Sequence, residues 1–129
     1  MISVDTNIIV RFLTQDDPVQ FKKSRALFES HEVFITDTVI LETEWVLRFA
    51  YNFDAESVAN GLRLLFGLPN VQLSNPPLIA QALEWHLDGM DFADALHLAN
   101  SQQFDELYTF DKKFIKKSEG LTGCNVLEP

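Results

Sequence analysis

Four acidic residues stand at positions where a single carboxylate would be costly to bury. Asp5 and Asp111 each follow an apolar, strand-like run, while Glu42 and Asp94 lie on expected helix faces that should be buried. An unpaired carboxylate at such a position loses its hydration without compensation. Carboxylates that surround a divalent cation avoid this cost, because the cation supplies the missing positive charge. The four acids therefore favour a metal site.

Glu42 has the most apolar surroundings of the four in the sequence. Its neighbours at helical spacing, on the expected stripe, are Val39, Trp45, Val46 and Phe49. A solvated position for Glu42 is not expected on such a stripe. The alternative interpretation is a structural ion pair with Arg48 or another base, although a buried pair contributes little net stability.

The other three acids also have a plain alternative interpretation as helix N-caps. Asp5 begins the run Asp5-Thr6-Asn7, in which every residue is a good cap. In the functional interpretation, the Thr6 hydroxyl and the Asn7 amide hold the carboxylate or a metal-bound water. Both interpretations of this tripeptide stay open.

The second group of acids lies in the last third of the chain. If Asp91 caps a helix, Asp94 falls in its first turn, and both carboxylates lie at the positive end of the helix dipole. The functional interpretation needs Asp94 to point inward and Asp91 to stay peripheral. Asp111 follows Thr109 and Phe110. In its alternative interpretation, Asp111 is only the cap of the basic helix after it.

The bulk charge and composition limit the possible functions. The chain has 129 residues and a formal net charge of −9, which argues against nucleic-acid binding through overall charge. We expect one domain over residues 1–129, no membrane span, no signal peptide and a cytoplasmic location. The single cysteine, Cys124, excludes an internal disulfide and fits a reducing compartment.

A cluster of lysines directly follows Asp111. In a helix, Lys112 and Lys116 form one pair at i and i+4, and Lys113 and Lys117 form another. The plain interpretation is a solvated surface helix. The functional interpretation is a basic ridge, in which we expect Lys112, Lys113 and Lys116 to bind RNA.

Strand-like and helix-like segments alternate along the whole chain. Strands are expected at 2–5, 33–35, 71–73, 107–109 and 125–127. Helices are expected at 7–13, at 18–30, from the caps at 36–38 to about 50, from 54 to about 66, from 75 to about 87, from 91 to about 101, and after 111. This alternation predicts an α/β fold with a short, mostly parallel central sheet and helices on both faces. Ligands of such sheets lie outside the carboxyl ends of the strands, where Asp5 and Asp111 are expected.

The ordered motifs resemble those of the PIN-domain ribonucleases, and most closely the VapC toxins of bacterial toxin–antitoxin pairs. The segments that carry the resemblance are residues 1–7, Leu41-Glu42, residues 91–99 and residues 107–114. Each motif is short, but the set occurs in order and covers essentially the whole chain.

The resemblance implies a site, a cofactor and partners. In such proteins, the acids that correspond to Asp5, Glu42, Asp94 and Asp111 surround one or two Mg²⁺ or Mn²⁺ ions. Asp5 and Asp94 are the best candidates for direct ligands, while Glu42 and Asp111 bind directly, bind through water or orient the nucleophile. The supporting residues are Thr6, Asn7, Asp91 and Thr109. The implied partners are an RNA substrate, a small antitoxin and a second copy of the chain in a homodimer.

The chemistry implied by these residue types is hydrolysis. Oxygen-only ligands suit a hard cation such as Mg²⁺ or Mn²⁺, and a metal-activated water can attack a phosphodiester bond. A phosphatase with an aspartate nucleophile is a poor alternative, because the second aspartate that it needs is replaced by Asn7. The other alternative is a PIN-fold module that binds RNA or protein without cleaving it.

Overall fold

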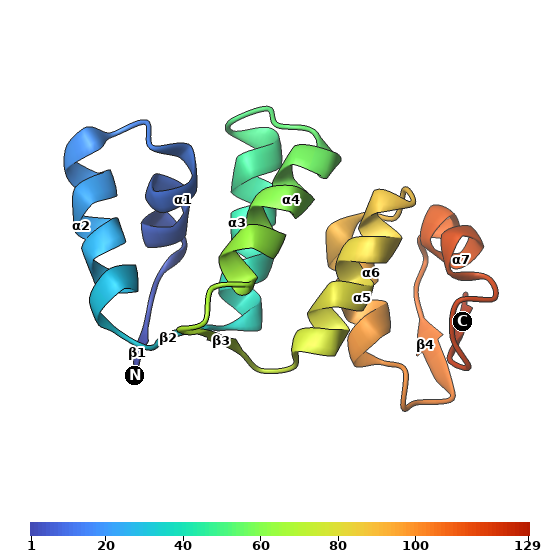
Figure 1. Cartoon of the computed structure of the whole chain (residues 1–129). Helices are drawn as coiled ribbons and strands as arrows, with labels where there is room; N and C mark the ends of the chain where they lie inside the picture. The colour runs from blue at the N-terminus through green and yellow to red at the C-terminus, as the bar shows by residue number, and fades with distance from the viewer. The chain divides into compact units, whose positions relative to one another are not determined.

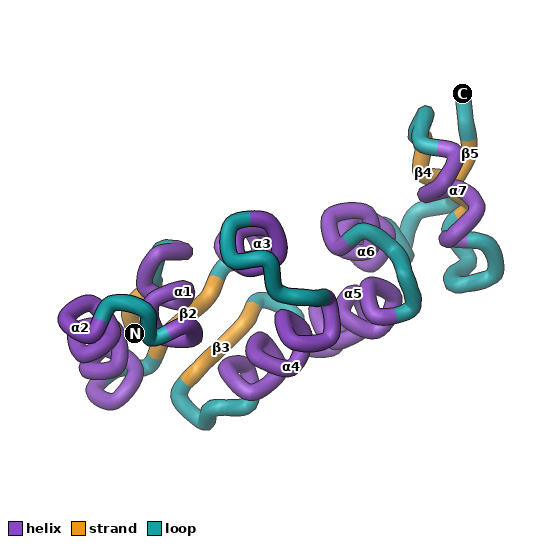
Figure 2. The backbone as a smooth tube through the Cα atoms, turned by 90° about the horizontal axis from the view of Figure 1, so that it is seen from above, coloured by secondary structure: helices purple, strands orange, loops and turns teal.

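The chain folds into two compact units in the computed structural model, which describes residues 1–129. The N-terminal unit spans Met1–Ser74 and the C-terminal unit spans Asn75–Pro129. Figure 1 labels the helices of both units and strands β1 to β4, and Figure 2 also labels β5. The expectation of one domain over residues 1–129 stays a prediction.

The N-terminal unit is built on a parallel sheet of three short strands. Its elements are β1 (Ile2–Ser3), α1 (Thr6–Thr14), α2 (Pro18–Ser30), β2 (Val33–Ile35), α3 (Asp37–Phe49), α4 (Ala55–Phe66) and β3 (Val71–Leu73). The strand order is β1-β2-β3, with Val33 of the central strand opposite Ile2 and Val71 (Figure 2). Because all three strands run in the same direction, the helices that follow β1 and β2 both begin at the carboxyl edge of the sheet.

The helix starts of this unit follow from the local sequence. Asp17 and Asp54 each cap a helix, the Asp54 carboxylate accepting from the Ser57 N–H at 2.7 Å. Pro18 lies in the first turn of α2, where a missing N–H has no consequence. Helix α1 ends at Gln15, which has a left-handed backbone (φ 55°).

A polar network closes the loop between α1 and α2. The Arg11 guanidinium donates to Asp16 at 2.8 Å and to the Tyr51 hydroxyl at 2.9 Å, and Tyr51 donates to Asp16 at 2.7 Å. The hydrogen bond from Tyr51, joined by one from Thr14, lowers the pKa of Asp16 to about 2. Asp16 therefore remains an anion at every ordinary pH, and the network ties the end of α1 to the segment after α3.

The C-terminal unit combines a helix pair with a second parallel ladder. Its elements are α5 (Pro76–Leu87), α6 (Phe92–Asn100), β4 (Glu106–Tyr108), α7 (Lys112–Ser118) and β5 (Asn125–Leu127). Helices α5 and α6 pack against each other, and α7 packs on β5. The turn between α5 and α6 passes through Gly89, whose positive φ of 110° few other residues adopt.

Each unit has its own buried apolar residues. The largest fully buried apolar side chains in the N-terminal unit are Ile9, Ile35, Ile40, Leu62 and Leu65, and those in the C-terminal unit are Phe92, Ile79, Leu83 and Leu98. Buried His86 lies beside this second set, its ring nitrogen 2.7 Å from the Met90 carbonyl and its ring edge against Phe92.

The predicted α/β class and the order of all twelve elements are confirmed. Most bounds agree within one or two residues, and every strand pairing is parallel. The five strands form a three-stranded and a two-stranded ladder. No helix has both the length and the apolar composition that a membrane crossing requires.

Candidate active site

Asp5 and Glu42 are linked through Thr6 in the N-terminal unit. Asp5 follows β1 and caps α1, its carboxylate accepting from the Thr6 N–H at 2.7 Å. The Thr6 side chain is only 4% exposed, and its hydroxyl donates to Oε1 of Glu42 on α3. Thr6 therefore holds one acid through its backbone and the other through its side chain. Asn7 instead lines a pocket between α1 and α2.

This linkage predicts the effect of removing the Thr6 hydroxyl. Thr6→Val keeps the shape of the side chain but removes the hydroxyl that donates to Glu42, so we expect a loss of about 1 kcal/mol in the free energy of unfolding. Urea denaturation measures this loss. Thr6→Ser, which restores a hydroxyl, should recover most of it, and equal losses in both variants would show that packing rather than the hydrogen bond matters.

The expected burial of Glu42 is wrong. Glu42 is exposed, and its stripe partners Trp45 and Phe49 are 57% and 59% exposed. The buried stripe of α3 consists of Ile40, Thr43, Glu44 and Leu47. These residues also recur at helical spacing, one position later than the predicted stripe, so periodicity alone could not distinguish the two faces.

The buried acid of α3 is Glu44. It is 1% exposed, and its Oε1 lies 2.9 Å from Nε of Arg48, one turn further along. Arg48 also covers the ring of Phe49, with its guanidinium carbon 4.6 Å from the ring centre. The ion pair with Arg48, which the sequence interpretation considered for Glu42, belongs to Glu44.

The other acids lie in the C-terminal unit, at the starts of α6 and α7. Asp91 caps α6 and accepts from the Asp94 N–H at 3.3 Å. Asp111 caps α7, and its Oδ1 accepts from the N–H groups of Lys113 and Phe114 at 3.0 and 3.1 Å. The cap interpretation is thus confirmed for Asp91 and Asp111. The cap at Asp111 uses only Oδ1, so its Oδ2 is available to a ligand.

Thr109 fixes the approach to Asp111. Its hydroxyl accepts from the Asp111 N–H at 3.0 Å, and its own N–H donates to the carbonyl of Leu127 at 2.9 Å. The segment between β4 and α7 is therefore tied to the ladder, and the supporting role expected for Thr109 has a local structural basis.

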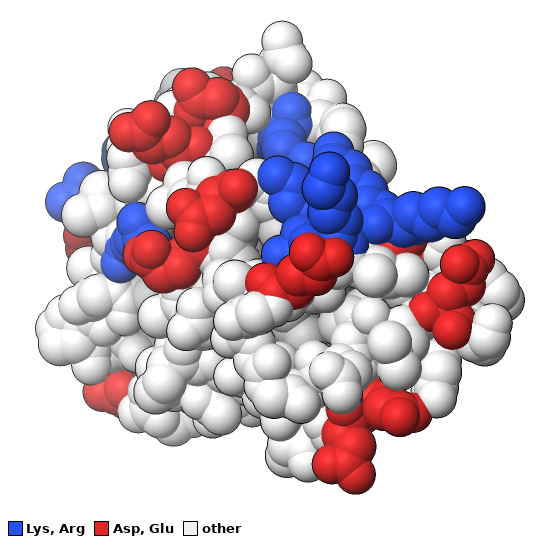
Figure 3. Space-filling view, turned by 90° about the vertical axis from the view of Figure 1, so that its right-hand side faces the viewer, with Lys and Arg blue, Asp and Glu red and all other residues white.

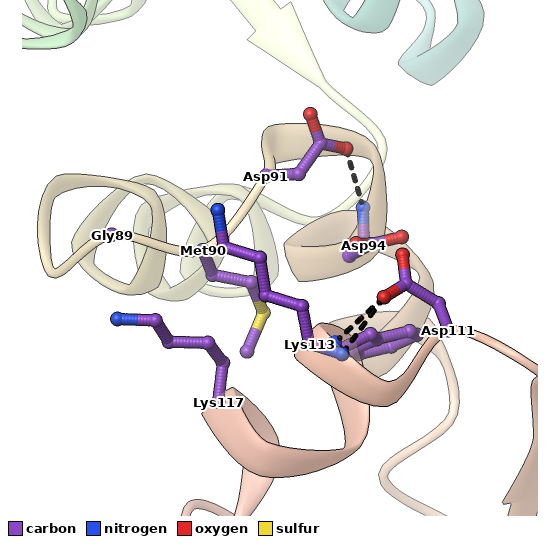
Figure 4. Close-up of a pocket in the computed structure, with 8 residues that line it drawn as sticks. Gly89, Met90, Asp91, Asp94, Asp111, Lys113 and Lys117 are labelled. Carbon is purple, nitrogen blue, oxygen red and sulfur yellow. Dashed lines mark hydrogen bonds between the residues drawn. The ribbon is translucent and has the colours of Figure 1, made fainter.

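Asp94 and Asp111 both line one pocket of the C-terminal unit. The pocket has a volume of about 310 Å³ and is walled by the α5–α6 turn, α6 and α7. Figure 4 shows the two carboxylates facing each other, with Asp91 further out. Lys113 and Lys117 line the same pocket. Asp94 thus points toward Asp111, and Asp91 lines the same pocket further from Asp111.

The electrostatics of the pocket act on Asp94. Partial burial, followed by the charges of Asp91 and Asp111, raises the pKa of the Asp94 carboxyl, while His97 opposes the shift. Asp94 forms no salt bridge and lies near two other carboxylates, which is a situation that a cation would relieve.

The oxygens in this pocket suit a hard cation. Mg²⁺ binds proteins through one or two carboxylates and keeps several waters, so Asp94 and Asp111 are a sufficient donor pair from this unit. No three His, Cys, Asp or Glu side chains form a cage for a metal ion. These residues therefore fit an open metal site, in which waters and substrate supply the remaining ligands, rather than a site built entirely from protein ligands.

Two features, one in each unit, were missed by the sequence interpretation. Lys117 lines the pocket, whereas Lys112 and Lys116, which were preferred, do not. Asp37 was considered only as a helix cap, but its Oδ1 is buried without a hydrogen-bond partner in the first turn of α3. The sequence shows the spacing of Lys113 and Lys117, but it does not show which side of α7 faces the pocket.

Most of the chain is similar in sequence to a known protein family. The family model described as PIN domain matches residues 2–120, which includes most of both units. Among curated protein sequences, none matches. Among solved structures, the chain is similar to VapC20 of Mycobacterium tuberculosis, described as a toxin that cleaves the sarcin–ricin loop. The identity is 21% and the TM-score 0.43, over 88% of this chain and 92% of that one.

Proposed function

The chain belongs to the PIN domain family, and from this premise we propose that it is a metal-dependent endoribonuclease that hydrolyses RNA phosphodiester bonds. The observation that carries the proposal is the pocket in which Asp94 and Asp111 face each other beside two lysines. The ordered sequence motifs support a further assignment as the toxin of a type II toxin–antitoxin pair, with an antitoxin partner and a homodimeric state.

We assign the metal to the four acids of the original set. These acids are Asp5, Glu42, Asp94 and Asp111. When bound, a hard cation such as Mg²⁺ or Mn²⁺ makes a water more acidic and neutralises the charge that develops on the phosphate.

The chain's own residues orient these acids. Thr6 holds Glu42 through its hydroxyl, so that this carboxylate keeps one orientation although it is exposed. The two backbone N–H groups at the start of α7 hold Oδ1 of Asp111 and leave Oδ2 available. Asp94 needs no such restraint, because α6 already points it into the pocket.

Addition of Mn²⁺ tests the metal dependence in two ways. At a tenfold excess over its dissociation constant, Mn²⁺ should stabilise the fold by about 1.4 kcal/mol, which corresponds to a rise of about 5 °C in Tm. Mn²⁺ or Mg²⁺ should also start cleavage of structured RNAs, and EDTA should stop it.

Asp5→Asn is the control for both measurements. Cleavage that is equal in the variant and the parent would indicate a contaminating nuclease. RNA binding without cleavage in the parent would favour the alternative of a binding module. An unchanged Tm at millimolar Mn²⁺ would contradict the metal site.

A further inference from the structure

The basic residues of the C-terminal unit are all concentrated on α7. Lys112, Lys113, Lys116 and Lys117 are its only Lys or Arg residues, and Figure 3 shows basic side chains gathered on this side of the unit beside scattered acids. None of the four takes part in a salt bridge. Their charges are therefore available to a ligand rather than being used within the fold.

The two i, i+4 pairs of α7 differ in what they face. Lys113 and Lys117 line the pocket with Asp94 and Asp111, whereas Lys112 and Lys116 do not. In Figure 4 the side chains of Lys113 and Lys117 extend along the wall of the pocket opposite Asp94. One pair is thus part of the pocket, and the other lies elsewhere on the surface of α7.

Gly89 makes room for the end of Lys117. A Cβ atom at position 89 would lie 3.1 Å from Nζ of Lys117, closer than side-chain atoms ordinarily approach. The positive φ of Gly89 also disfavours any other residue at this turn. The ammonium group of Lys117 therefore lies against bare backbone at the mouth of the pocket, where a side chain would otherwise displace it.

The acids of the pocket repel a polyanion, so binding of RNA needs nearby positive charge. Resting on the proposed nuclease function, we propose that Lys113 and Lys117 together bind an RNA backbone phosphate adjacent to the one that is cut. They act from α7, the helix that Asp111 caps, across the pocket from Asp94. Lys112 and Lys116 contribute only general attraction, which salt screens.

Two double variants with equal loss of charge test this assignment. Lys113→Gln/Lys117→Gln removes the pocket pair, and Lys112→Gln/Lys116→Gln removes the matched pair on the same helix. Both are made in the Asp5→Asn background with Mg²⁺ present, so that a fluorescein-labelled RNA hairpin is bound without being cut. All four lysines are exposed, and circular dichroism checks that α7 still folds.

The two variants should differ clearly in affinity. We expect the loss of the pocket pair to weaken RNA binding about tenfold or more. It should also reduce the slope of log Kd against log salt by about one. The loss of the control pair should weaken RNA binding less than about threefold, because salt screens exposed surface charges. With otherwise native protein, the pocket variant should raise KM with little change in kcat.

The outcomes separate this inference from the proposed function. Equal weakening by both pairs, or no measurable binding by the Asp5→Asn parent, would overturn the assignment of Lys113 and Lys117, whether or not the native protein cleaves RNA. Selective weakening by the pocket pair, in a native protein that cuts nothing with Mn²⁺, would support the phosphate site and contradict the nuclease function.

Discussion

Asp94→Asn is expected to reduce RNA cleavage by about a thousandfold or more while leaving the fold intact. Asparagine keeps the size of the side chain but removes the negative charge that the cation needs. Asp94 lines the pocket and faces Asp111, so the loss should appear in kcat rather than in RNA affinity. Single-turnover cleavage at saturating protein measures it.

The same variant should be more stable than the parent when metal is absent. Because the folded protein raises the pKa of Asp94, ionised Asp94 destabilises the fold at neutral pH, and protonation relieves this effect as the pH falls through the raised pKa. The stability advantage of Asp94→Asn should therefore be present at neutral pH and shrink on acidification. Thermal melting in EDTA between pH 4 and pH 7 follows this difference.

Asp88→Asn is the matched control. Asp88 is exposed at the end of α5, six positions earlier in the chain, and does not line the pocket. It should keep full cleavage and the stability of the parent. Full activity in Asp94→Asn would remove Asp94 from the metal set, and lower stability in EDTA would show that its role is structural.

The fold was predictable because its signals are local. Pro18 and Asn75-Pro76-Pro77 mark helix starts, Asp54 marks another, and short apolar runs separate them. Each signal depends on a few adjacent residues, so no knowledge of tertiary packing is needed. The caps at Asp91 and Asp111 were predictable for the same reason.

The burial of the acidic residues was only partly predictable, because it depends on which helix face packs inward. In α3, the stripe through Glu42 and the stripe through Glu44 both contain apolar residues at helical spacing. The structure buries the second, and the spacing of Arg48 four residues after Glu44 agrees with this choice. The same uncertainty applies to α7, where the sequence did not show that Lys117 rather than Lys116 lines the pocket.

Glu42→Gln and Glu44→Gln should have opposite effects, although only one residue separates them. Glu42 is exposed, and Gln at this position can still accept from Thr6, so we expect loss of cleavage with little change in stability. Glu44 is buried, and its replacement leaves Arg48 without its anion. We expect about 3 kcal/mol of destabilisation, or about 10 °C in Tm, with activity retained by the protein that stays folded.

Replacement of the arginine tests the ion pair between Glu44 and Arg48 from its other side. Arg48→Ala leaves the carboxylate of Glu44, which is 1% exposed, without its cation and should cost about 3 kcal/mol as well. Arg25→Ala breaks a pair of the same spacing in α2 whose side chains are both 60% exposed, and should cost less than about 0.5 kcal/mol. Burial is what distinguishes the two acids. If Glu44→Gln and Glu42→Gln destabilise the fold equally, the assignment of a structural role to Glu44 and a catalytic role to Glu42 is wrong.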